Sequence, residues 1–243
     1  MRLRFDHAII AVHDLDEATE NYKALGFNPL FGGVHAGGGT HNALIYFADG
    51  SYLELLAPTG KTPEAGKPDF TTLLQRGEGL IGYALGSDDL STTVQYLRDN
   101  GLTVADVQEG GRKRQDGIEL RWKSAMIVGS MSPFFIEDVT PRNQRVLDDS
   151  ESTQQPNGIT GISAVHIIIN HDLSRRYEQI LGEEQSMYTL SDGVSIHLIP
   201  PENDDLKGYM DVRGDAPFAL YLKGEAGLMF HLEQSHHARL IVG

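Results

Sequence analysis

The chain has 243 residues, of which 40% are hydrophobic and 22% charged, as in a soluble protein with enough length for a full core. Its formal net charge of −14 argues against nucleic acid and against an anionic membrane as partners. Cysteine is absent, which excludes disulfides, thiolate catalysis and thiolate metal sites. Any metal must therefore be held by His, Asp, Glu or main-chain groups.

No run of the sequence is long and apolar enough to span a bilayer. A strand pattern begins almost at the first residue and leaves no room for a signal peptide in this sequence. We therefore expect a cytoplasmic location.

The first part of the chain predicts the order β-α-β-β-β. Residues 5–12 are rich in Ile and Val and predict a strand that contains His7. Asp14 is typical of a helix N-terminus, and Gly26 ends the helical spacing that follows it. A strand over 28–34, a glycine-rich turn and a hairpin complete this unit.

The hairpin at 41–58 reads HNALIYFADGSYLELLAP and turns at Asp49-Gly50, a dipeptide that tolerates positive φ. Its second run carries one acid, Glu54, among apolar residues. An unpaired charge is costly to bury, so Glu54 must face water, a partner or a metal. Residues 192–201 read DGVSIHLIPP and repeat this hairpin with His197 in the place of Glu54. One position of a repeated hairpin thus carries a metal-ligating residue type twice.

The same order of elements recurs twice more along the chain. The second unit is expected at 78–140 and the third at 159–243, whereas residues 141–158 have the composition of an exposed linker. Strands are expected over 80–85, 104–108, 118–128 and 133–139, and then over 162–169, 187–190, 194–199, 218–222 and 238–242. Each expected helix opens with an Asp-Leu pair, at Asp14, Asp89 and Asp172. An internal repeat outranks local propensity when a fold is predicted.

Tandem β-α-β-β-β units, with a ligand-type residue in the first strand and Glu in the fourth, resemble the vicinal oxygen chelate superfamily. Its members include glyoxalase I, extradiol dioxygenases and bleomycin-resistance proteins. The segment GGGTHNALIYFADGSYLELLA, and DGIELRW followed by SPFFIE, look like its glyoxalase-like branch. The resemblance covers about residues 4–140.

It implies an α+β fold with a domain at 1–140, in which modules at about 1–58 and 78–140 form a cupped mixed sheet with helices outside. Residues 159–243 would add a third, partial module. In this superfamily a divalent metal is bound in the cup by the first and fourth strands of each unit.

By this resemblance, His7 and Glu54 match the first-strand and fourth-strand ligands. The first-strand position of the second unit falls on Gly82, which has no ligating side chain. The fourth-strand position falls near Glu137, with an ambiguity of one residue that would turn Glu137 to the other face of its strand. The four-ligand site of glyoxalase I is therefore not intact.

His41, at the start of the third strand, is a further candidate ligand. His7, His41 and Glu54 would form a set of two histidines and one carboxylate, which suits Fe, Mn, Zn or Ni. A turn residue that bonds its own loop is the alternative reading of His41. Glu54 is also the candidate catalytic group that moves a proton. Asn42, with donors and an acceptor, is expected to orient the substrate.

Residues 112–114, Arg-Lys-Arg, form the only basic cluster of this acidic chain and would attract an anionic substrate to the mouth of the cup. For Arg112 and Lys113 a solvated hairpin end is the favoured reading. The other expected substrate-binding residues are Tyr52, Arg114, Arg121, Trp122, Phe135 and Glu137, and core packing is an equal alternative for Phe135. In the third unit, His197 is expected to be structural and His236-His237 to lie in an exposed turn.

Two functions stay open at this point. One is a metal-dependent enzyme that acts on a small oxygenated molecule by isomerisation, lyase chemistry or oxygenation. The other is a metal-free protein that sequesters a small molecule, as bleomycin-resistance relatives do. In both cases the expected partner is a small molecule rather than nucleic acid or membrane. The third module would then serve as a homodimer contact or as a cap on the cavity.

Overall fold

The computed structural model describes residues 2–62, 74–130, 132–225 and 227–243. The first module consists of β1 (Leu3–Ala11), α1 (Leu15–Ala24), β2 (Leu30–Val34), β3 (Thr40–Tyr46) and β4 (Tyr52–Pro58). The second consists of β5 (Gly79–Ser87), α3 (Leu90–Asp99), β6 (Gln108–Lys113), β7 (Glu119–Met126) and β8 (Phe134–Asp138). The short helices α4 (Arg142–Arg145) and α5 (Ser150–Thr153) follow. The third module consists of β9 (Gly161–Ile168), α6 (His171–Leu181), β10 (Met187–Thr189), β11 (Ser195–Ile199), α7 (Asp204–Arg213), β12 (Ala219–Lys223) and β13 (Leu240–Val242).

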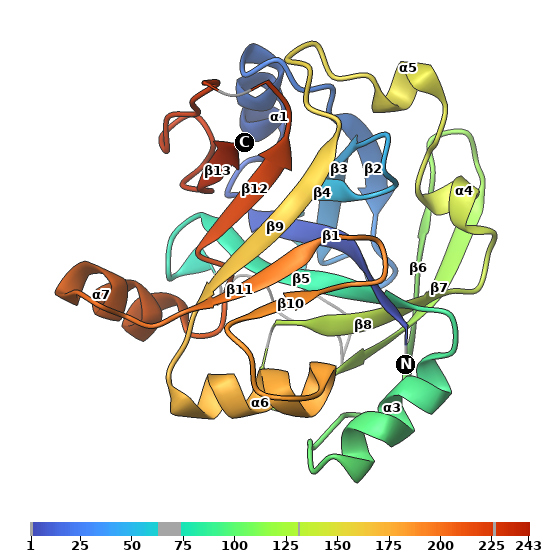
Figure 1. Ribbon diagram of the computed structural model, residues 1–243. Coiled ribbons are helices and arrows are strands. Elements are labelled where there is room, and N and C mark those ends of the chain that lie inside the picture. Colours follow the sequence, from blue (N-terminus) through green and yellow to red (C-terminus); the bar gives the residue numbers. More distant parts are fainter. Residues whose placement is uncertain (1, 63–73, 131, 226) are drawn as a thin grey trace.

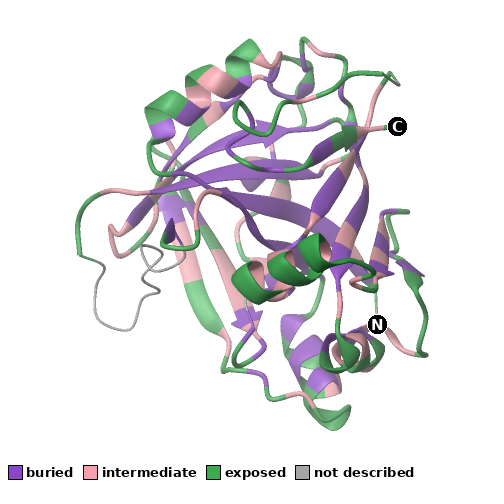
Figure 2. Ribbon diagram, turned by 90° about the vertical axis from the view of Figure 1, so that its left-hand side faces the viewer, coloured by how far each residue is buried: buried purple, intermediate pink, exposed green. Residues whose placement is uncertain are grey.

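The predicted α+β class with tandem modules is confirmed, and the helices lie around two packed sheets (Figure 1). Figure 2 shows the strands mostly buried and the outer sides of the helices exposed. One strand prediction was wrong: residues 104–108 make only an isolated bridge at Val104, and β6 begins at Gln108. No helix in the described part of the chain is long and apolar enough to cross a bilayer.

The helix starts follow the capping chemistry of the sequence. The Asp14 carboxylate accepts hydrogen bonds from two backbone N–H groups at the start of α1, and the Asp89 carboxylate accepts one from the Thr92 N–H at the start of α3. In the third module the cap is Asn170 rather than Asp172, so α6 begins earlier than predicted. Helix α7 was not predicted, because none of its residues is buried and it therefore lacks an apolar stripe.

The first two modules share one eight-stranded sheet with the strand order β2-β3-β4-β1-β5-β8-β7-β6. β1 pairs in parallel with β4 and antiparallel with β5, and the second pairing joins the modules. The two outer strands also approach each other. The Ala36 N–H donates to the Gly111 carbonyl at 2.9 Å, and the Arg112 guanidinium donates to the Gly32 carbonyl. The sheet therefore curves into a nearly closed cup.

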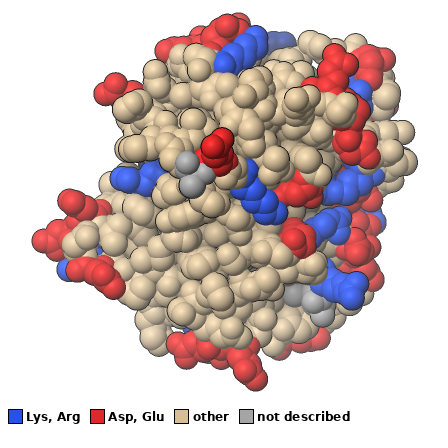
Figure 3. All heavy atoms as spheres, turned by 45° about the horizontal axis from the view of Figure 1, so that its top comes forward, with Lys and Arg blue, Asp and Glu red and all other residues tan. Residues whose placement is uncertain are grey.

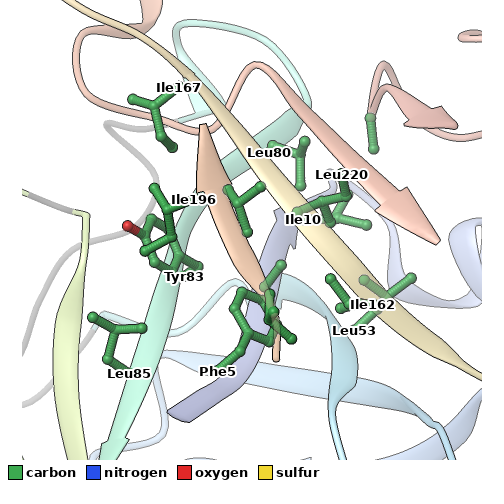
Figure 4. Packing of buried hydrophobic residues seen from close by; sticks show 14 of the residues in the cluster. Phe5, Ile10, Leu53, Leu80, Tyr83, Leu85, Ile162, Ile167, Ile196 and Leu220 are labelled. Atoms are coloured by element: carbon green, nitrogen blue, oxygen red, sulfur yellow. The ribbon is translucent and has the colours of Figure 1, made fainter. Parts of the chain in front are cut away.

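The third module forms a five-stranded sheet with the order β10-β11-β9-β12-β13. It packs face to face on the outer side of the eight-stranded sheet, where Phe5, Ile10 and Tyr83 meet Ile162 and Ile196 in one core (Figure 4). Burial of side chains of this size stabilises the fold by about 1.5–3 kcal/mol each. The third module therefore stabilises the cup by packing against the outer face of its sheet.

The repeated hairpin turns of the first and third modules hold the two sheets together reciprocally. The Asp49 carboxylate accepts a hydrogen bond from the Ile162 N–H at 3.2 Å and pairs with the Lys223 ammonium at 2.8 Å. The Asp192 carboxylate accepts one from the Phe5 N–H at 2.7 Å. The repeated Asp-Gly dipeptide thus has a structural role, because each turn binds the first strand of the other module.

The segment 141–158 is not the exposed linker that its composition predicted. It forms α4 and α5, and the side chains of Arg145 and Gln155 are buried. The Gln155 amide donates to the Tyr46 carbonyl at 2.8 Å and accepts from the Asn28 N–H at 2.7 Å. The segment is therefore bonded along the β2–β3 edge of the cup.

The surface agrees with the acidic composition. On the face shown in Figure 3, Lys and Arg side chains lie among Asp and Glu side chains rather than apart from them. This mixture matches the several exposed ion pairs, of which Arg98 with Asp106 at 3.1 Å is one.

Candidate functional site

The cup encloses a cavity of about 420 Å³, a size suited to a small molecule. Its walls are mostly apolar and its floor is polar. The apolar lining comprises Ile9, Leu44, Leu56, Met126, Phe134 and Ile136. Among the described residues, none of those that line the cavity comes after Arg145, so the third module does not cap the cavity.

Two histidines and one glutamate meet on the floor. His7 from β1 places its Nε2 atom 3.4 Å from Oε2 of Glu54 on β4. His35, which follows β2, places its Nε2 atom 3.5 Å from Oε1 of the same carboxylate. The Asn42 Nδ2 atom donates to Oε1 of Glu54 at 2.7 Å. Each oxygen of the Glu54 carboxylate therefore faces one imidazole.

Backbone geometry fixes Asn42 in this position. The amide lies against Gly32, where a Cβ atom would collide with its Oδ1 atom. β2 has a register shift between Phe31 and Gly33, so Gly32 is the extra residue of a bulge. The glycine at this position therefore makes room for the side chain that orients Glu54.

A buried carboxylate lies directly behind His7. The Asp6 carboxylate accepts from the Nδ1–H of His7 at 2.7 Å, which leaves Nε2 of the ring for the cavity. Consecutive strand residues normally face opposite sides, but β1 is shifted in register between Phe5 and His7, and this bulge brings both side chains to the site.

Arg145 from α4 neutralises Asp6. All five of its N–H donors are used: two on Asp6, two on Asp138 and one on the Tyr52 hydroxyl. Arg142 donates to the Asp6 carboxylate as well. The segment between the second and third modules therefore holds the carboxylate that orients His7.

The charges of the site follow from these contacts. Burial opposes the charge of Glu54, but the hydrogen bond with His7 and the positive charges nearby lower its pKa to about 2. Burial also opposes the charge of His7, yet its bonds to Asp6 and Glu54 raise its pKa. For His35 burial dominates and lowers the pKa. At neutral pH, Glu54 is thus ionised.

The Glu54 pKa predicts a pH dependence of stability. Because the folded-state pKa of about 2 is lower than the ordinary value of 4.5, Glu54 stabilises the fold above pH 4.5 and this contribution is lost as the pH falls through about 2. Between about pH 5 and about pH 3, we expect Glu54 to account for a loss of about 2 kcal/mol in the free energy of unfolding. Urea denaturation in EDTA should show a smaller loss for Glu54→Gln than for wild type. Equal losses would contradict the low pKa.

The structure brings several of the predicted residues together. His7, Asn42, Tyr52, Glu54 and Trp122 all line the cavity. The Tyr52 ring stacks on His7 with a centroid distance of 4.5 Å. Trp122 lies edge-on to His35 at 6.2 Å. These five predicted residues therefore share one cavity.

Three predicted residues lie on the opposite face of their strands. His41 alternates with Thr40 and Asn42, which line the cavity, and packs near Phe31 outside it. The predicted set of His7, His41 and Glu54 is therefore not assembled.

The ambiguity of one residue on β8 is resolved in favour of Phe134 and Ile136, which line the cavity. Phe135 is part of the core behind the sheet. Glu137 accepts from the Leu90 N–H at the start of α3 and pairs with Lys123. Neither Phe135 nor Glu137 can contact a ligand in the cup.

The two predicted arginines are also outside the cavity. Arg114 donates to the Gln144 carbonyl and pairs with Asp116 at 2.7 Å, and Arg121 is exposed. Arg112, expected at a solvated hairpin end, is instead buried and lines the cavity. Of the basic residues 112–114, Arg112 therefore lines the cavity, whereas the predicted Arg114 does not.

Sequence reasoning missed His35, Asp6 and Arg145. Strand alternation could have excluded His41, because neighbouring strand residues face opposite sides and His41 and Asn42 cannot both face Glu54. With His41 excluded, His35 was the remaining histidine near this hairpin. No sequence signal marks Asp6, whose orientation depends on a bulge, or Arg145, which reaches the site from a segment of polar composition.

The histidines of the third module lie outside the cavity. His166 and His197 are neighbours on β9 and β11, with ring centroids 4.7 Å apart. His236 is buried and not exposed as predicted, since it bonds Glu78 at 2.9 Å and stacks on Tyr22. This contact fixes the end of the chain to the first module.

Comparison with known proteins agrees with the geometry. The family model of the glyoxalase-like domain matches residues 5–181. The chain belongs to the glyoxalase-like domain family. A crystal structure of a hypothetical protein from Staphylococcus aureus is similar over 100% of both chains, with 18% identity and a TM-score of 0.75. This likeness includes the third module, so the complete arrangement is a fold seen elsewhere.

A mutant of 4-hydroxymandelate synthase from Streptomyces coelicolor matches 92% of this glyoxalase-like chain and 71% of its own, with 13% identity and a TM-score of 0.62. Methylmalonyl-CoA epimerase from Streptomyces coelicolor matches 58% of this chain and 100% of its own, with 28% identity and a TM-score of 0.43. The sequence matches no curated protein. The likeness to 4-hydroxymandelate synthase is one of fold.

Proposed function

We propose that this glyoxalase-like protein is a metal-dependent enzyme that acts on a small oxygenated molecule within the cup. The observation that supports this most is the convergence of His7 and His35 on the carboxylate of Glu54. Two imidazoles and a carboxylate are the donor types that bind Fe, Mn, Zn and Ni. Asp6 behind His7 adds the supporting carboxylate that is typical of metal-bound histidines.

The chemistry of these donors fits a divalent metal, although the described residues contain no group of three His, Asp or Glu side chains already arranged as a metal cage. The three side chains contact one another, and Asn42 also bonds Glu54. A metal held by His7, His35 and Glu54 would therefore replace these contacts and would need Nε2 of His7 without a proton.

A divalent metal bound there would act as a Lewis acid on a substrate with two neighbouring oxygen atoms. Within the chain itself, Glu54 is better suited to be a ligand than a proton acceptor, because a carboxylate with a pKa of about 2 is a weak base. Asn42 orients the carboxylate, and Asp6 orients His7. The apolar walls would keep water away from the bound molecule.

The alternative is a metal-free binding protein. Two observations favour it: the described residues form no ready-made metal cage, and Gly82, which pairs with Ile9 beside the site, offers no ligand. In that case the same cavity would hold a small molecule by its apolar walls and polar floor.

A metal assay separates the two functions. We expect freshly purified protein to carry about one transition metal per chain, or to gain thermal stability with Mn²⁺, Fe²⁺, Ni²⁺ or Zn²⁺. A His7→Ala, Glu54→Ala double variant should lose this response. Elemental analysis and a thermal-shift series are the measurements.

The matched control is a double substitution outside the cup, His41→Ala with Glu137→Ala, which removes the same residue types. It should keep the metal response. Wild-type protein that carries no metal and gains no stability from any of the four ions would contradict the metal-dependent enzyme and leave the binding protein as the favoured function.

A further inference from the structure

Arg112 is a buried cation that faces the ligand cavity without a carboxylate partner. It lies on β6, is 7% exposed and lines the cavity. Its guanidinium donates to the Gly32 carbonyl, and it makes a long contact of 3.4 Å with the Tyr46 hydroxyl. These two bonds use two of the five N–H donors of a guanidinium.

Arg145, the other buried arginine that lines the cavity, differs from Arg112 in its hydrogen bonding. Arg145 uses all five donors and is paired with the carboxylates of Asp6 and Asp138. By contrast, no Asp or Glu oxygen in the described chain lies within 4.0 Å of an Arg112 nitrogen. A buried charge without a counter-ion is costly in free energy. Binding of an anion in the cavity would therefore stabilise the Arg112 guanidinium.

The position of Arg112 places such an anion close to the candidate metal ligands. Its main chain pairs with that of His35 in an isolated bridge. Trp122 lies on the same wall, with its indole against Gly110, where a Cβ atom would collide with the ring. An anion at Arg112 would therefore lie between the polar floor and an aromatic surface.

We propose that Arg112 binds a carboxylate of the ligand, so that the cavity accepts small organic acids. The planar fork of arginine matches a carboxylate in two parallel hydrogen bonds. The apolar body of the acid would pack against Trp122 and Phe134. That its oxygen atoms then face His7, His35 and Glu54 rests on the proposed function, but the carboxylate contact does not.

A fluorescence titration tests the proposal, because Trp122 is the single tryptophan of the chain and reports on the cavity directly. The probes are 3-phenylpropionate and its neutral isostere 3-phenylpropionamide, added to metal-free protein in EDTA. We expect the acid to bind about tenfold more tightly than the amide, since a hydrogen bond between charged partners contributes more than a neutral one. Equal binding of the two probes, or tighter binding of the amide, would overturn the proposal.

Variants locate the effect. Arg112→Gln should reduce the acid-to-amide preference to about twofold or less, and Arg112→Lys should keep part of it, because the charge stays but the fork is lost. Arg114→Gln removes the same charge two residues along the chain, outside the cavity, and should keep the full preference. If Arg114→Gln lowers it as much as Arg112→Gln does, the net charge and not Arg112 is responsible.

The preference in the wild-type protein tests the proposal even if Arg112→Gln does not fold. Because the protein is metal-free and EDTA is present, the result does not depend on the proposed metal. A protein that binds no metal but prefers the acid would refute the proposed enzyme and retain the anion site. A protein that binds metal but does not prefer the acid would refute the anion site and retain the proposed enzyme.

Discussion

Replacing Arg145 by alanine is expected to lower the free energy of unfolding by about 3–5 kcal/mol, because the substitution leaves buried carboxylates without their main partner. Asp6 is fully buried and Asp138 nearly so, and Arg145 donates two hydrogen bonds to each of them. The pKa of Asp6 is held well below its ordinary value: burial opposes its charge, but Arg145, His7 and Arg142 together outweigh burial. Without the Arg145 guanidinium, Asp6 keeps only Arg142 and His7 as partners. Urea denaturation followed by circular dichroism measures the loss.

Arg98→Ala is the matched control for this experiment. Arg98 pairs with Asp106, whose side chain is 91% exposed, and donates to the Val104 carbonyl at 2.9 Å, so its removal should cost only about 1–2 kcal/mol. Arg145→Lys should restore only part of the stability, because an ammonium has three donors and no planar fork. A loss below about 1 kcal/mol for Arg145→Ala would show that the network contributes little and that Asp6 is not dependent on it.

Replacing His35 by alanine is expected to weaken metal binding by more than 100-fold, whereas His41→Ala should change it by less than about threefold. Loss of a residue that only supports a ligand costs roughly 10- to 100-fold, and loss of a ligand itself should exceed this. His35 contacts Glu54 across the cavity floor, but His41 lies on the other face of β3. Competition titration of Zn²⁺ and Mn²⁺ against a chromophoric chelator measures the affinities.

Asp6→Asn completes this series. Asp6 holds the His7 ring without reaching the cavity floor itself, so its amide variant should fall between the two histidine variants, at roughly 10- to 100-fold weaker binding. A His41→Ala effect as large as that of His35→Ala would mean that the ligand set is the one predicted from the sequence. Unchanged affinity in all three variants would place the metal elsewhere in the protein.

The pairing of His7 with Glu54 was predicted from the sequence, and the structure brings these side chains to 3.4 Å. It was predictable because the resemblance to the superfamily implied that the strands carrying these two residues are neighbours. The error over His41 came from not applying the period of two to residues 40–42, since Asn42 and His41 were both assigned to the site. On β8 the sequence left two registers open, and a shift of one residue exchanges Phe134 for Phe135.

The sequence by itself determined the modules, the turns at Asp49-Gly50 and Asp192-Gly193, and the family. These features depend on local chemistry: hydrophobic period, capping side chains and glycine at positive φ. Tertiary structure alone decided that the third module packs on the outside of the cup instead of capping it, that Arg112 and Arg145 line the cavity, and that Asp6 bonds His7 from behind. Bulges, the meeting of β2 with β6, and a hydrogen bond between residues 139 positions apart in sequence produce these contacts. No local pattern encodes them, because each depends on how distant strands align when the sheet curves.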